Sequence, residues 1–246
     1  SEWGKQVHDL AKTGTIEGQG AAFNMWIAAM QELKDPFKGQ EETMARPAWK
    51  RLTAAAEKFN EPGRFTALIG FEWTSGPNGD NLHRNVVLRD GQARASQVFP
   101  FSSWNSEDPE KLWDWMEAYE QRTGGRALAI PHNGNLSNGR MYAAQTFSGA
   151  PLTRDYAERR QRWEPVQEIV QMKGASESHP KLSPSDEFLE YGIAGWELGN
   201  LTLGGKLTPE MMPTSFVRAG FMRGLEHEAK LGVNPFKSGI IGSSDA

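Results

Sequence analysis

Short apolar segments without a helical period alternate with amphipathic helical segments along most of this chain, and this alternation constrains the fold most strongly. Residues 126–130 are one such segment: a double glycine precedes it and Pro131, which cannot donate to a sheet ladder, follows it. Similar segments predict further strands at 65–72, 81–88, 165–171 and 238–242, with helices at 47–59, 152–163 and 214–231 and another starting at Asp108. The alternation predicts an α/β fold with parallel strands.

The first quarter of the chain has a different pattern from the rest. Residues 1–62 are mostly polar, with Phe23, Trp26 and Met30 spaced as on one face of a helix, which predicts a helical amino-terminal segment acting as a cap or an insertion. Residues 63–246 carry the predicted strands. The sequence therefore predicts a boundary near residue 62.

Composition excludes several classes of function. The chain of 246 residues contains no cysteine, so it has no disulfide, thiolate metal site or cysteine nucleophile, and any metal must be held by His, Asp or Glu. The net charge of −4 gives no basic footprint for nucleic acid. No apolar run approaches the roughly 18 to 20 residues that a membrane span needs. The composition leaves the cellular compartment open.

Four titratable side chains lie next to the predicted strands. Glu72 and Asp245 come at or after the ends of two strands, His132 follows a third, and His83 stands near the start of a fourth. Because strand ends hold side chains in fixed positions, this group predicts a centre for a divalent metal, which would activate water for hydrolysis. Each residue has a structural alternative: a hydrogen-bonded surface histidine, an ion-paired acid or, for Asp245, a helix cap.

Four further residues flank these strand ends and are candidates for binding substrate. They are Arg84, Asn133, Lys173 and His179. Arg84 and Lys173 would suit an anionic group on a small substrate. The alternative for each of the four is a solvated loop position.

Several longer motifs resemble a known family. Gly70-Phe-Glu-Trp-Thr-Ser75, Asn81-Leu-His-Arg-Asn-Val86, Ala129-Ile-Pro-His-Asn-Gly-Asn135, the region 168–180 and Leu231-Gly-Val-Asn-Pro-Phe236 closely resemble the bacterial family called domain of unknown function 3604. That family looks like a branch of the PHP class, named for polymerase and histidinol phosphatase. The resemblance implies a distorted (β/α)7 barrel, of which residues 63–246 would form the central and carboxyl-terminal part.

The resemblance also implies a ligand set. Glu72 matches the bridging acid of the class, His83 and His132 match its isolated histidines, and Asp245 matches the first member of a closing Asp-x-His pair. The class uses two or three divalent ions, such as Zn, Mn or Fe, in the intact protein. This chain lacks the His-x-His and Asp-His pairs of the class. We therefore expect an incomplete barrel in a fragment that is inactive alone and binds fewer ions or none.

The expected function of the parent protein is hydrolysis of a phosphate ester by metal-activated water. The first alternative keeps the metal but cleaves another bond, such as a sulfate ester, a phosphonate or an amide. The second is a non-catalytic carbohydrate-binding module that uses exposed tryptophans such as Trp73 and Trp104. A homo-oligomer is also expected, because a second copy would cover the exposed edge of an incomplete barrel.

Overall fold

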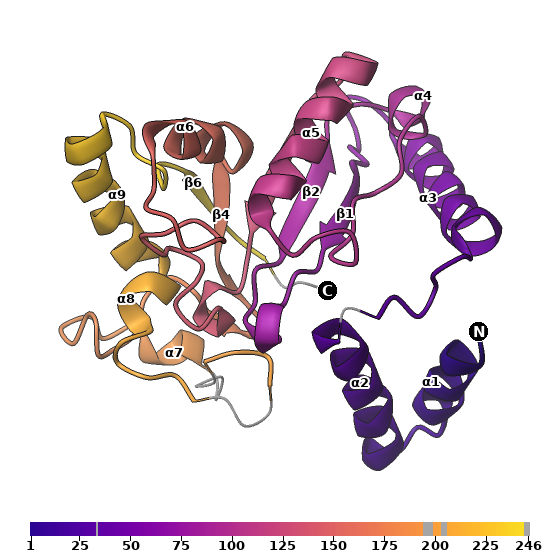
Figure 1. Cartoon of the computed structure of the whole chain (residues 1–246), viewed down its shortest axis with the longest axis horizontal. Coiled ribbons are helices and arrows are strands. Elements are labelled where there is room, and N and C mark those ends of the chain that lie inside the picture. The colour runs from indigo at the N-terminus through magenta and orange to yellow at the C-terminus, as the bar shows by residue number, and fades with distance from the viewer. Residues whose placement is uncertain (33, 194–198, 203–205, 244–246) are drawn as a thin grey trace.

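The computed structural model describes residues 1–32, 34–193, 199–202 and 206–243 and has a mixed α/β fold (Figure 1). Two three-stranded sheets have the strand orders β1-β2-β3 and β5-β4-β6. The strands are β1 (Ile69–Trp73), β2 (Arg84–Leu88), β3 (Ala127–Pro131), β4 (Val166–Gln171), β5 (Gly174–Ala175) and β6 (Gly239–Gly242). The helices are α1 (Glu2–Lys12), α2 (Ile16–Gln31), α3 (Arg46–Phe59), α4 (Gln92–Ala95), α5 (Pro109–Thr123), α6 (Arg154–Trp163), α7 (Glu190–Ile193), α8 (Met212–Ser215) and α9 (Val217–Leu231).

The first sheet is antiparallel throughout. β2 pairs with β1 and with β3 in the opposite direction, so that β1 and β3 run the same way on either side of it. The connection from β1 to β2 contains a short 3-10 turn at Pro77–Gly79 and no crossover helix. A short connection of this kind can only return the chain beside the strand that it leaves, in the antiparallel sense.

The predicted (β/α)7 barrel is wrong. In such a barrel every neighbouring pair of strands is parallel and every connection carries a helix. Here the first sheet is antiparallel, and in the second sheet only β4 and β6 pair in parallel. The strands within the described ranges form two separate small sheets that close no barrel.

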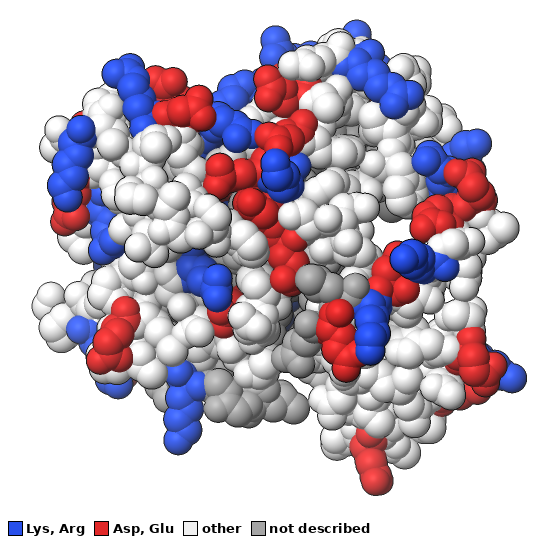
Figure 2. Space-filling view, viewed as in Figure 1, with Lys and Arg blue, Asp and Glu red and all other residues white. Residues whose placement is uncertain are grey.

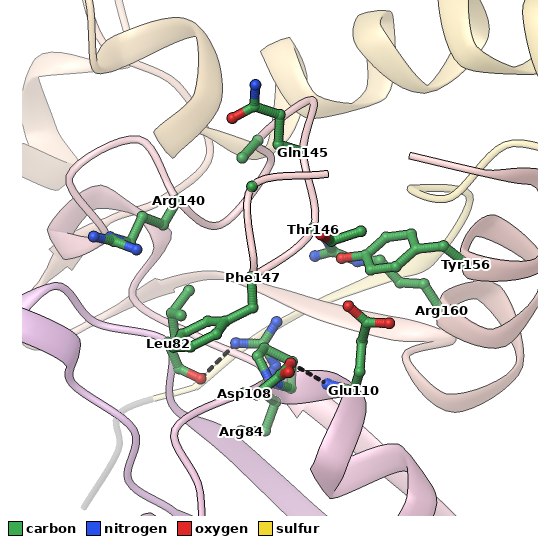
Figure 3. A pocket seen from close by; sticks show the side chains of 13 residues that line it. Leu82, Arg84, Asp108, Glu110, Arg140, Gln145, Thr146, Phe147, Tyr156 and Arg160 are labelled. Carbon is green, nitrogen blue, oxygen red and sulfur yellow. Dashed lines mark hydrogen bonds between the residues drawn. The ribbon is translucent and has the colours of Figure 1, made fainter. Parts of the chain in front are cut away.

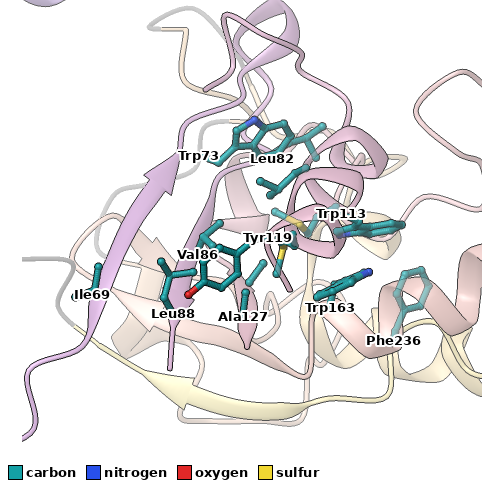
Figure 4. Close-up of a cluster of buried hydrophobic side chains, with 14 of the residues drawn as sticks. Ile69, Trp73, Leu82, Val86, Leu88, Trp113, Tyr119, Ala127, Trp163 and Phe236 are labelled. Atoms are coloured by element: carbon teal, nitrogen blue, oxygen red, sulfur yellow. The ribbon is translucent and has the colours of Figure 1, made fainter. Parts of the chain in front are cut away.

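One face of the first sheet carries the hydrophobic core (Figure 4). Alternate residues of β2 and β3 are buried, as expected for a sheet with one covered face. Helices α5 and α6 both contact β3 and bring large side chains to the core. The central members of this core are Val86, Leu88, Ala129, Leu112, Trp113, Met116, Tyr119 and Trp163. The opposite face of β2 and β3 is only half-buried.

Helix α5 begins where the sequence predicts and has a capping residue at each end. The Asp108 side chain accepts a hydrogen bond from the backbone N–H of Glu110 at 2.9 Å, and Pro109 occupies the first helical position. Gly124 ends the helix in the left-handed conformation, with φ of 65°. These two caps fix the length of the helix that covers the core.

Residues 1–62 contain the helices α1, α2 and α3. Trp3, Trp26 and Phe37 form an aromatic cluster with ring centroids 5.0–6.0 Å apart beside α1 and α2, which pack against each other (Figure 1). Helix α3 is instead part of the core, because Trp49 is buried there and its indole N–H donates to the Ala95 carbonyl. The boundary at residue 62 stays a prediction. No helix in the described ranges is both long and apolar enough to cross a membrane.

Candidate metal centre

Glu72, His83 and His132 lie at one end of the first sheet, where the ends of its three strands meet. Glu72 is near the carboxyl end of β1, His83 directly precedes β2, and His132 directly follows β3. Because β2 is antiparallel to both neighbours, its first residues lie at the same end of the sheet as the last residues of β1 and β3. The antiparallel sheet thus brings together three of the four residues that the sequence predicted to meet, although by a different arrangement of strands.

The same three side chains also lie on one face of the sheet. Glu72 pairs with Asn85, and Asn85 pairs with Ile130. His83 and His132 are each two residues from these partners, and side chains two residues apart on a strand share a face. The backbone N–H of His132 donates to the His83 carbonyl at 3.4 Å, which extends the ladder by one pair. This face is opposite to the one that carries the core.

The three side chains converge on a common point. Glu72 Oε1 lies 2.8 Å from His83 Nδ1 and 3.3 Å from His132 Nε2. One ligand atom from each residue lies within 4.8 Å of the others, and the imidazole rings cross at 78°. Both histidines are buried, whereas the side chain of Glu72 is 39% exposed. The three residues therefore form a candidate metal site that opens on the side of the carboxylate.

The charge states at this site suit a cation. Burial alone would raise the pKa of Glu72, but the two histidines outweigh it and hold that pKa well below its usual value, so the side chain is a carboxylate. Burial lowers the pKa of His83 and outweighs the opposing effect of Glu72, so its imidazole is neutral above its usual pKa of 6.5. An ionised carboxylate and a neutral imidazole are the forms that bind a metal.

Each histidine has one ring nitrogen that faces Glu72 and one that has no partner. His83 Nδ1 and His132 Nε2 lie beside Glu72 Oε1, whereas His83 Nε2 and His132 Nδ1 have no hydrogen-bond partner in the described ranges. Two buried imidazoles that face one carboxylate oxygen, in place of a separate hydrogen-bond partner for each ring, need another explanation. A divalent ion that accepts their lone pairs fits these residues.

Arg84 does not lie at the metal centre. It follows His83 directly, so its side chain points to the core face, where its Nε lies 3.0 Å from Glu164 Oε1. A cavity of about 220 Å³ lies on that side, and Arg84 is one of the residues that line it (Figure 3). The cavity is also lined by Arg160, Tyr156, Phe147, Glu110 and Arg140. The structure therefore separates Arg84 from the histidine beside it in the sequence.

The other predicted substrate-binding residues have different surroundings. Asn133 is buried next to His132, and its side-chain oxygen accepts a hydrogen bond from Gln171 Nε2 at 2.8 Å. Lys173 follows β4 and contributes to lowering the pKa of His83, so it acts electrostatically on the centre. His179 is buried beside Phe216, and its Nδ1 accepts the backbone N–H of Lys181. Asp245 lies outside the described residues.

Gln171 is a residue of this region that the sequence patterns did not single out. Its side chain connects the end of β4 with Asn133, and its own oxygen accepts the backbone N–H of Lys173. It could have been found as a polar residue at the end of a predicted strand, which is also the position of His132, although β4 contains Gln167 and Glu168 and is less apolar than β3. A glutamine carries no charge and suggests no specific chemistry, so that signal is weak.

Of the two tryptophans that the carbohydrate-binding alternative expects at the surface, Trp73 is fully buried in the core and Trp104 is half-buried. The indole N–H of Trp73 donates to the Ser106 carbonyl at 3.2 Å.

Acidic and basic side chains are interspersed on the molecular face shown in Figure 2.

A family model described as "Protein of unknown function (DUF3604)" matches residues 1–246. No curated protein and no solved structure matches the chain. None of these findings connects it with the PHP class.

Proposed function

The chain belongs to the DUF3604 family, whose description states no activity, and from the chemistry of its site we propose that it is part of a metal-dependent hydrolase. Glu72, His83 and His132 would bind a divalent cation. The observation that supports this proposal is the convergence of two buried imidazoles on one carboxylate oxygen, at 2.8 and 3.3 Å.

The donor set favours a catalytic site over a structural one. Structural zinc sites use four protein ligands, whereas catalytic sites use about three and leave a position open. Two histidines and one glutamate also suit Mn or Fe. When bound, the ion would supply a Lewis acid and lower the pKa of a water molecule to about 7.

The residues of the chain have separate roles in this proposal. Glu72 supplies the negative charge that offsets part of the charge of the cation, and its exposure gives the substrate a way in. His83 and His132 hold the ion in a rigid position, because the sheet ladder fixes their backbones. Lys173 adds a positive potential that favours an anionic substrate, for which a phosphate ester is our first choice.

Metal content tests the binding step. The purified chain is supplied in turn with Zn, Mn and Fe, freed of unbound ions and measured by element-resolved mass spectrometry. We expect a stable complex with one of these metals that is lost in the double variant His83→Ala, His132→Ala and kept in His8→Ala, whose histidine is exposed on α1. Equal metal content in the double variant, or none in the wild type, would contradict the proposal.

Substrate screening then tests the reaction. The metal-loaded chain is assayed against phosphate, sulfate and phosphonate esters and simple amides. Glu72→Gln removes the charge but keeps the shape, and we expect it to weaken metal binding by about tenfold or more and to reduce any hydrolysis with it. Hydrolysis that persists in this variant without bound metal would show a different mechanism.

A further inference from the structure

Two fully buried asparagines flank the histidines of the metal centre. Asn81 precedes His83 by two residues, and Asn133 directly follows His132. In each, the side-chain nitrogen Nδ2 is shielded from solvent and has no hydrogen-bond partner in the part of the chain that the structure describes. Buried amide donors are nearly always paired, so two unpaired ones beside the same centre call for a ligand.

Hydrogen bonds from the backbone fix the orientation of both amides. The backbone N–H of His83 can only donate, and it donates to Asn81 Oδ1 at 3.0 Å. The backbone N–H of Lys173 likewise donates to Gln171 Oε1 at 3.0 Å, which turns Gln171 Nε2 toward Asn133 Oδ1. In both asparagines the oxygen is therefore the occupied atom and the NH₂ group is the free one.

The two asparagines belong to neighbouring loops at the same end of the first sheet. The backbone N–H of Asn81 donates to the Leu136 carbonyl at 2.9 Å, which joins the loop before β2 to the turn after β3. Asn133 adopts the left-handed conformation with φ of 50°, which asparagine tolerates better than most residues. Both amides are thus held by fixed backbone beside the metal ligands.

We propose that Asn81 and Asn133 donate hydrogen bonds to the oxygen atoms of a tetrahedral oxyanion, the phosphate or sulfate group of a substrate, at this centre. This inference rests on the proposed metal-dependent function. Fixed donors in a site shielded from water stabilise negative charge without reorganising. The strongest alternative donor near these residues in sequence, Arg84, is engaged with Glu164 and the Leu82 carbonyl on the opposite face.

Conservative variants of the two asparagines test this role. Asn81→Asp and Asn133→Asp keep the oxygen that accepts the fixed hydrogen bond but replace the unpaired NH₂ group with a second oxygen. Titration calorimetry of the metal-loaded protein with inorganic phosphate and with sulfate gives the affinity for each anion. We expect each variant to bind the preferred anion about tenfold or more weakly than the wild type, with metal affinity kept or increased.

Two further variants separate loss of the donor from charge repulsion. Asn133→Gly keeps the left-handed backbone and Asn81→Ser keeps an acceptor for the His83 N–H, and neither adds a charge. Both should also weaken anion binding. These two variants also test the donor role if an aspartate variant fails to fold.

Asn135 provides the matched control. Its Nδ2 donates to the Lys173 carbonyl at 3.1 Å and its Oδ1 accepts from Ser176 Oγ at 2.8 Å, so its amide is paired at both ends. Asn135→Asp should lower the melting temperature and leave the affinity for the anion unchanged.

The outcomes separate the two proposals. Metal-loaded Asn81 and Asn133 variants that bind phosphate and sulfate like the wild type would overturn the donor role and leave the metal site standing. A metal-loaded wild type that binds neither phosphate nor sulfate would also overturn the donor role and leave the metal site standing. A wild type that takes up no metal overturns both. Preference for phosphate over sulfate, or the reverse, would support the inference and identify the ester.

Discussion

Glu164 lies between two arginines in the protein core. Its Oε1 is 3.0 Å from Arg84 Nε, its Oε2 is 3.1 Å from Arg160 Nε, and the indole N–H of Trp113 donates to Oε1. Burial alone would raise the pKa of Glu164, but the two arginines outweigh it and hold that pKa below its usual value. The carboxylate is therefore ionised in the folded protein and offsets the charge of two buried cations.

Replacing Glu164 with glutamine should destabilise the protein strongly. The variant leaves two buried guanidinium groups without their counter-charge, which costs about 3–5 kcal/mol in the free energy of unfolding. Urea unfolding at pH 7, followed by tryptophan fluorescence, measures this difference. A loss below about 1 kcal/mol would show that the arginines find other partners.

The same ion pairs make stability dependent on pH. Because the pKa of Glu164 is lower in the folded than in the unfolded state, its contribution is present above the usual pKa of 4.5 and is lost as the pH falls further. Unfolding experiments between pH 7 and pH 3 should therefore show a steeper loss of stability for the wild type than for Glu164→Gln. Equal slopes would contradict this account.

The sequence predicted the cluster of candidate metal ligands better than the residues around it. Glu72, His83 and His132 were identifiable because each lies next to the start or the end of a predicted strand, and that position survives a change in strand direction. Arg84 was expected at the same centre because it is next to His83. Consecutive residues on a strand point to opposite faces, and only the register shows which face carries the core.

At the scale of the element, Gly70 lets β1 approach β2 closely. A Cβ atom at this position would lie 2.6 Å from the Val86 carbonyl oxygen, which belongs to the backbone and cannot move aside. Gly239 in β6 offers a contrast, because a Cβ atom there would lie 3.8 Å from its nearest neighbour, the Pro165 carbonyl oxygen. Replacing glycine by alanine would therefore cause a clash at Gly70 in β1 and an ordinary van der Waals contact at Gly239 in β6.

Gly70→Ala should therefore weaken both the fold and the metal site. We expect a loss of about 1–3 kcal/mol in the free energy of unfolding, and weaker metal binding because Glu72 is two residues away on the same strand. Gly239→Ala should change stability by no more than about 0.5 kcal/mol and leave metal binding unchanged. Thermal unfolding and metal titration of both variants check this, and equal effects would contradict it.

Strand boundaries show a limit of local sequence patterns. The apolar run predicted a strand at 65–72, whereas β1 spans Ile69–Trp73. Ile69 pairs with Leu88, the last residue of β2, so β1 can start no earlier than its partner allows. Phe65 pairs instead with Glu61 in an isolated bridge. The partner strand thus sets a boundary that the local composition does not contain.

At the scale of the whole molecule, strand direction is what the sequence did not reveal. The structure contains both helices and strands, but the predicted α/β fold with parallel strands is wrong: the first sheet is antiparallel, and β1 and β2 are joined without a helix. The turn residues of that connection, Gly76, Pro77 and Asn78, with φ of 57° at Asn78, favour a reversal of the chain. A turn of this kind is incompatible with a (β/α)7 barrel, in which a helix joins each strand to the next.

The amino-terminal helices provide a test of the predicted division of the chain. A variant without residues 1–38 loses α1, α2 and Phe37 but keeps α3, whose Trp49 belongs to the core. We expect it to fold cooperatively and to bind metal like the full chain, because Glu72, His83, His132 and their strands lie outside the removed segment, although α2 contacts the Pro77–Gly79 turn. Trp49→Ala should instead cost about 3–5 kcal/mol of stability.

Unfolding curves and metal titrations compare these two variants with the full chain. Loss of metal binding on removal of residues 1–38 would show that this segment is an integral part of the site.

His83 and Arg84 are consecutive and point to opposite faces of the first sheet. This arrangement limits the positions at which relatives of this chain can gain or lose residues. Added residues at Asn78, the exposed residue of the otherwise largely buried connection between β1 and β2, would enlarge a loop and leave both strands in place. A single residue inserted between His83 and Leu88 would turn an imidazole or a guanidinium to the wrong face of β2. Insertions and deletions are therefore expected in the loop and not in the strand that follows it.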